Sequence, residues 1–149
     1  MPTRRLIRDV SRVNKSSIFL IGMMSGFIVS PLKAGITDAP FGVFIAHLFL
    51  SGVIAFAYGI VLRSARRSGP GVGFQISIFH WCVAGIGIGL LPNRPDLSFF
   101  MAGNGTWSFI QFAMMHFLYG TLVGTLFDRC AIRAEYPEPL NEPHHTIAD

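Results

Sequence analysis

Four long apolar runs occupy most of the 149-residue chain, at residues 17–36, 41–62, 72–91 and 107–127. Each run has the roughly twenty residues that an α-helix needs to cross a hydrocarbon layer about 30 Å thick. Only 13% of the residues are charged, which is about half the share usual in soluble domains. The sequence therefore predicts an all-α integral membrane protein, a bundle of four transmembrane helices.

The basic residues alternate with these runs instead of forming one surface patch. Most of the twelve Lys and Arg residues lie before the first run, between the second and third, or after the fourth; they are Arg4, Arg5, Arg8, Arg12, Lys15, Arg63, Arg66, Arg67, Arg129 and Arg133. Only Lys33 and Arg94 lie in the other two connections. Short loops rich in Lys and Arg stay in the cytoplasm. We therefore expect both termini to be cytoplasmic, and we expect no nucleic-acid partner.

The chain divides into three parts by composition. Residues 1–16 form a basic N-terminal segment, residues 17–134 form the transmembrane domain, and residues 135–149 form a tail rich in proline and acidic residues. Such a tail cannot bury enough apolar surface to fold, so we expect it to be extended or disordered. His144 and His145 lie in this tail without a nearby third ligand, so we predict no metal site.

A faint internal repeat favours two tandem helical hairpins of the same orientation. The first run ends in the pattern Gly26-x4-Pro31-x-Lys33, and the third ends in Gly87-x4-Pro92-x-Arg94. The second and fourth runs each carry a histidine in their first half and end near arginines.

Pairs of glycines four residues apart favour close approach of neighbouring helices, because glycine has no side chain to hold them apart. Three such pairs lie wholly within the apolar runs, and the predicted packing positions are Gly22, Gly26, Gly85, Gly89, Gly120 and Gly124. These pairs exceed what one compact four-helix bundle needs. Some of them are therefore candidates for contact with a partner chain.

Three histidines inside the runs are the candidate functional residues: His47, His80 and His116. An ionisable group at membrane depth is costly, so it usually faces other helices and finds a partner there. A rise of about 1.5 Å per residue places His80 and His116 at similar depth and His47 nearer the outer surface. The expected polar interhelical network comprises His47, Ser51, Tyr58, Ser77, His80, His116 and Tyr119.

Four interpretations of these polar groups compete. They can fix helix packing by hydrogen bonds between helices. His80 and His116 can be ligands of a haem or a chlorin. The same groups can serve the permeation of protons or small solutes, although no carboxylate lies within a run. Catalysis within the membrane is the fourth, although the chain has no HExxH motif, no paired intramembrane Asp and no Gly-x-Ser-x-Gly motif.

The spacing of His47, Ser51 and Tyr58 resembles the second-span pattern of the YagU family of bacterial inner-membrane proteins. His80 ahead of Pro92, and His116 in the fourth run, are also similar to that family. The resemblance covers roughly residues 18–143 and implies a four-span protein of the bacterial inner membrane. It brings no activity with it, because none is established for the family. This chain differs in a shorter first outer connection and in Lys33, where the family tends to have an acid.

Taken together, these features favour a non-enzymatic membrane protein. We expect an accessory or structural subunit of a membrane complex, or a small bundle that associates with itself. Its partners are then the lipid bilayer and either other membrane subunits or further copies of this chain. The alternatives are a haem- or chlorin-binding electron-transfer or pigment protein, and a protein for proton or small-solute permeation.

Overall fold

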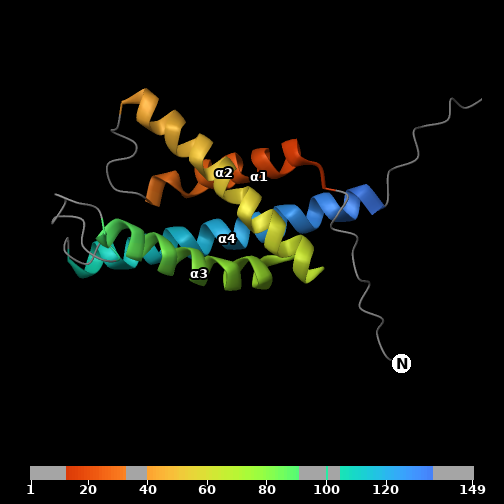
Figure 1. Ribbon diagram of the computed structural model, residues 1–149. Helices are drawn as coiled ribbons and strands as arrows, with labels where there is room; N and C mark the ends of the chain where they lie inside the picture. The colour runs from red at the N-terminus through yellow and green to blue at the C-terminus, as the bar shows by residue number, and fades with distance from the viewer. Residues whose placement is uncertain (1–12, 33–39, 91–99, 101–104, 136–149) are drawn as a thin grey trace, which may run out of the picture.

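The computed structural model describes residues 13–32, 40–90, 100 and 105–135, and these residues contain helices and no strand. The elements are α1 (Lys15–Val29), the short 3₁₀ helix η2 (Ser30–Leu32), α2 (Phe41–Ala65), α3 (Pro70–Gly89) and α4 (Thr106–Glu135). Figure 1 shows their arrangement. The prediction of an all-helical chain is confirmed.

Four helical segments are long and apolar enough to cross a membrane. They are Lys15–Leu32, Phe41–Ala65, Pro70–Gly89 and Thr106–Ile132, with 18, 25, 20 and 27 residues. A membrane helix needs about 17 to 25 residues, so every segment meets the requirement. The chain is therefore a multi-pass membrane protein, as the apolar runs predicted. The helices end a few residues away from the predicted limits, and α4 continues about two turns beyond residue 127.

Local sequence signals set several helix ends. The side chain of Asn14 accepts a hydrogen bond from the backbone N–H of Ser17 at 2.7 Å, which caps the start of α1. α2 ends at Ala65, and the left-handed conformation of the next residue, Arg66 (φ 49°), stops the helix. Gly69, at φ 114°, then turns the chain, and Pro70 provides the first residue of α3. Proline is favoured there because the first helical N–H has no partner within the helix.

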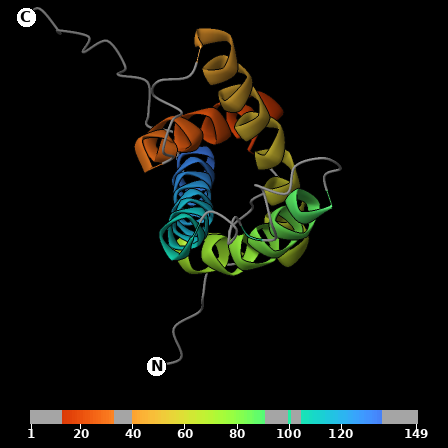
Figure 2. The same ribbon diagram turned by 90° about the vertical axis from the view of Figure 1, so that its left-hand side faces the viewer.

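The helices pack as two sequential pairs, α1 with α2 and α3 with α4. α4 also packs against α1, while α2 meets α3 and α4 less extensively. In the two views of Figures 1 and 2, α4 lies between α1 and α3. The start of α1, the end of α2, the start of α3 and the end of α4 share the right-hand end in Figure 1. We call this the basic end, because the described Lys and Arg side chains lie on these four helix ends: Lys15, Arg63, Arg66, Arg67 and Arg129.

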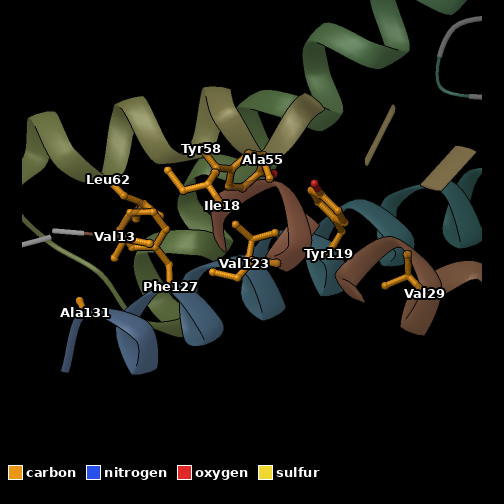
Figure 3. Close-up of a cluster of buried hydrophobic side chains, with 11 residues drawn as sticks. Val13, Ile18, Val29, Ala55, Tyr58, Leu62, Tyr119, Val123, Phe127 and Ala131 are labelled. Atoms are coloured by element: carbon orange, nitrogen blue, oxygen red, sulfur yellow. The ribbon is translucent and has the colours of Figure 1, made fainter. Parts of the chain in front are cut away.

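The buried core lies between α1, α2 and α4, towards the basic end (Figure 3). Leu62, Val123 and Phe127 are fully buried there. The outward faces of the helices are also apolar, with large side chains such as Phe41, Phe79 and Leu90 more than 70% exposed. A soluble protein seldom exposes so much apolar surface, whereas lipid tails cover it at no cost.

Candidate functional site: a tyrosine–histidine cluster

The polar residues of three helices meet near the middle of the spans. The hydroxyl of Tyr58 on α2 lies 3.2 Å from Nδ1 of His80 on α3, within hydrogen-bond distance. The two rings meet edge to face, with centroids 5.8 Å apart. This hydrogen bond joins α2 to α3, two helices that otherwise share little surface.

The second contact joins α3 to α4. The imidazole rings of His80 and His116 have centroids 4.7 Å apart. Nδ1 of His116 lies 2.7 Å from the carbonyl oxygen of Phe112, one turn earlier on α4. The Phe112 ring also contacts the imidazole ring of His116, with 4.3 Å between the ring centroids. His116 is therefore in ring contact with both His80 and Phe112.

Tyr119 completes the cluster from α4. Its ring contacts those of Tyr58 and His80, at 5.7 and 6.1 Å between centroids. Its hydroxyl donates a hydrogen bond to the backbone carbonyl of Ser51 on α2. Gly22 of α1 packs against the same carbonyl, and a Cβ there would lie 2.5 Å from the oxygen. Three helices thus meet at the Ser51 carbonyl.

The structure does not gather all the predicted polar side chains in this cluster. The Ser51 hydroxyl donates to the His47 carbonyl at 2.9 Å, within α2. The Ser77 hydroxyl donates to the Phe74 carbonyl at 2.6 Å, within α3. The Ser51 and Ser77 hydroxyls therefore bond within their own helices. The side chains of Tyr58, His80, His116 and Tyr119 contact one another across helices.

The predicted packing glycines lie in different surroundings. A Cβ at Gly22 would lie 2.5 Å from Cβ of Ala55, and one at Gly26 would lie 2.5 Å from Cβ of Ser51. Gly120 and Gly124 face α3 in the same way, whereas the Phe100 ring fills the space beside Gly85. The contacts of Gly89 lie outside what the structure describes.

Sequence reasoning missed Gly73, which has the tightest surroundings on α3. A Cβ at Gly73 would collide with the carbonyl oxygen of Gly120 and would lie 2.9 Å from Cα of Gly124. The backbones of α3 and α4 therefore touch two turns from the histidine pair. The signal was present as a glycine four residues after Gly69, but the expected third run began at residue 72 and left Gly73 at its margin.

Sequence reasoning also missed three hydrogen bonds at the basic end. The Ser68 hydroxyl donates to a carboxylate oxygen of Asp128 at 2.6 Å, and the backbone N–H of Gly69 donates to the Gly124 carbonyl at 3.1 Å. The guanidinium of Arg63 donates to the carbonyl of Val13. These bonds hold the turn between α2 and α3 to α4, and the end of α2 to the start of α1.

The spacing of the histidine rings bears on the haem alternative. Two axial nitrogens at about 2 Å from one metal place the imidazole centroids roughly 6 Å apart, with the macrocycle between them. The observed 4.7 Å is shorter, and the Gly73–Gly120 contact keeps α3 and α4 together nearby. The geometry disfavours a haem or chlorin between His80 and His116. Within the described residues, no group of three or more His, Cys, Asp or Glu side chains is placed to hold a metal ion.

Comparison of the chain with models of protein families, with curated proteins and with solved structures found no match.

Proposed function

We propose that this chain is a non-enzymatic membrane protein, either an accessory or structural subunit of a membrane complex or a bundle that associates with itself. The proposal rests on the hydrogen bonds that polar groups inside the spans form between helices. The Tyr58–His80 bond and the Tyr119–Ser51 bond both connect one helix to another. Hydrogen bonds between membrane helices are worth about 0.6 to 2 kcal/mol each. The cluster therefore stabilises a particular arrangement of helices, which is what an assembly protein requires.

The partner surface that we propose is the outer face of α3. Of the residues in α3, only Gly73, Ser77 and Gly85 are buried within the chain. Gly87 has open space where a Cβ would stand, and it is flanked by the exposed side chains of Val83 and Ile86. An exposed glycine between apolar side chains lets another helix approach closely. Gly22, Gly26, Gly120 and Gly124 face helices of this chain instead, whereas Gly87 lies open between apolar side chains, and we propose it as the position for a partner.

Substitution of Gly87 by leucine tests this proposal. The protein is extracted from its native membrane in lipid nanodiscs, and native mass spectrometry counts the chains in each particle. We expect more than one chain in the wild type and a loss of the assembly in Gly87→Leu. The matched control is Gly42→Leu, because Gly42 also has open space around it but lies on α2. A wild type that is a single chain with no companion contradicts the proposal.

We further propose a location in a bacterial inner membrane with both termini in the cytoplasm, as a YagU-like protein. The concentration of described basic side chains at one end supports the orientation, because such ends stay on the cytoplasmic side. Single cysteines introduced at Ser64 and at Thr106, both exposed and at opposite ends of the spans, test it in a background in which Cys82 and Cys130 are serine. A membrane-impermeant thiol reagent added to intact cells should label only the cysteine at position 106. Labelling of the cysteine at position 64 under the same conditions would contradict the proposed orientation and indicate the opposite one.

A further inference from the structure

Three arginines lie around the turn that joins α2 to α3. Arg66 and Arg67 follow the last residue of α2, and Arg129 lies in the last two turns of α4. All three side chains are exposed. We call Arg66, Arg67 and Arg129 the arginine triad.

Hydrogen bonds hold the backbone of this turn on both sides. The backbone N–H groups of Arg66 and Arg67 donate to carbonyl oxygens in the last turn of α2, at 3.1 and 3.3 Å. On the other side, the Ser68 hydroxyl donates to the Asp128 carboxylate at 2.6 Å. Arg67 precedes the donor of that bond and Arg129 follows its acceptor, so the bond brings α2 and α4 arginines to one place. A turn that is already ordered loses little entropy when it binds a ligand.

Positive charge is in excess at this place. Asp128 is the one acidic residue among the side chains that the structure describes. Three guanidinium charges therefore stand against one carboxylate charge beside the turn. Such a surplus attracts an anion, and most strongly at low ionic strength.

The arginine triad lies at the boundary of the spans. The span of α2 ends at Ala65 and that of α3 begins at Pro70, so Arg66 and Arg67 stand in the short connection just outside both. Arg129 lies in the last turn of the fourth span. A long basic side chain near a helix end extends to the interface with its charge in the polar layer. The arginine triad is therefore at the level of the lipid headgroups.

We propose that the arginine triad is a binding site for the headgroup of an anionic phospholipid. A guanidinium presents several N–H donors in a planar fork that matches the oxygens of a phosphate. Free phosphate offers the same oxygens, but the position at the span boundary favours a phosphate that is anchored in the bilayer. The site is independent of the assembly role, because it lies at the basic end and not on the outer face of α3.

Native mass spectrometry of the full chain in detergent tests the proposal, by titration with phosphatidylglycerol or phosphatidylcholine. Both lipids carry a phosphate, but only phosphatidylglycerol has a net negative charge. We expect the wild type to bind phosphatidylglycerol more tightly, and a wild type with equal affinity for the two lipids overturns the proposal. Inorganic phosphate that displaces the bound phosphatidylglycerol at equal concentration would overturn the choice of a lipid as the ligand.

Single substitutions locate the site. Arg66→Gln, Arg67→Gln and Arg129→Gln should each weaken the binding of phosphatidylglycerol about fivefold, the effect of one basic residue near an anionic surface. Lys15→Gln is the matched control, because it removes the same charge from an exposed position at the basic end. Lys15 lies on α1, which does not pack against α3 within the described residues, so we expect its affinity to match that of the wild type. An equal loss in Lys15→Gln would show a diffuse positive surface and overturn the site.

The comparison of the two lipids in the wild type does not depend on any variant. The measurement in detergent is also independent of which side of the membrane the basic end faces.

Discussion

The hydroxyl oxygen of Tyr58 lies 3.2 Å from Nδ1 of His80, although the two residues belong to different helices and are 22 positions apart. This bond is one of few direct connections between α2 and α3. The α1–α2 pair also meets the α3–α4 pair through the packing of α4 against α1 and α2. The Tyr58–His80 bond adds a direct link from α2 to α3, made by titratable side chains of the spans.

We expect Tyr58→Phe to lower the free energy of unfolding in lipid or detergent by about 0.6 to 2 kcal/mol, the range for hydrogen bonds between membrane helices. A double-mutant cycle with His80→Gln isolates the pairwise energy. The coupling should account for most of the loss in the single variant. A cycle of Tyr58→Phe with Thr125→Val, which loses a hydroxyl bonded within α4, should give no coupling. Equal coupling energies in the two cycles would contradict a specific interaction between Tyr58 and His80.

Substitution of Gly73 by alanine should destabilise the protein by about 1 to 3 kcal/mol, because an added methyl group must push α3 away from α4. The collision is with backbone atoms of Gly120 and Gly124, which cannot move aside as a flexible side chain can. Gly71→Ala is the control, because it lies on the same turn with open space around it. We expect its effect to stay within about 0.5 kcal/mol. Equilibrium unfolding in mixed micelles measures the stability of both variants. Similar losses of stability in the two variants would contradict the close approach of α3 to α4.

Ser68→Ala should loosen the turn between α2 and α3. The variant removes a donor to the Asp128 carboxylate, and hydrogen bonds to charged groups are worth about 1.5 to 3 kcal/mol when buried. Because this pair is only partly buried, we expect a smaller loss, of about 1 kcal/mol. Faster hydrogen exchange at the backbone N–H of Gly69 would show that the turn is loosened. Ser64→Ala, at an exposed position on the last turn of α2, should leave that exchange rate unchanged.

We expect the purified protein to have no visible absorption band. The contact of the His80 and His116 rings at 4.7 Å leaves too little room for a macrocycle between them. A Soret or chlorin band in the wild type that disappears in both His80→Gln and His116→Gln would show that α3 and α4 separate to admit a cofactor. A band unaffected by either change would place the pigment elsewhere.

The sequence predicted the helices well because their signal is local. Apolar runs of sufficient length have few alternatives to a membrane helix, and Pro70 and Arg66 mark ends that the backbone conformation explains. Counting residues also placed His80 and His116 at a common depth, and in the structure their rings are in contact.

The partners of each side chain were harder to predict, because they depend on how each helix is rotated about its axis. Tyr119 was expected in the network, but its acceptor is the Ser51 carbonyl, and a backbone atom carries no sequence signal. Phe112 was not expected as a partner of His116, since it supplies a carbonyl and a ring from its own helix. Gly73 was missed because Gly69, the glycine four residues before it, lies ahead of the expected start of the third run at residue 72.

The turn at Ser68 and Gly69 is bonded to α4 and not to α2. The described residues of the turn at Ser68 and Gly69 therefore belong with the second pair of helices, and the peptide bond after Arg67 lies at the boundary between the two pairs. Two separately translated fragments that meet at this point would each keep their own helix pair. The molecule is thus organised as two helical hairpins, α1–α2 and α3–α4, joined by the peptide bond after Arg67.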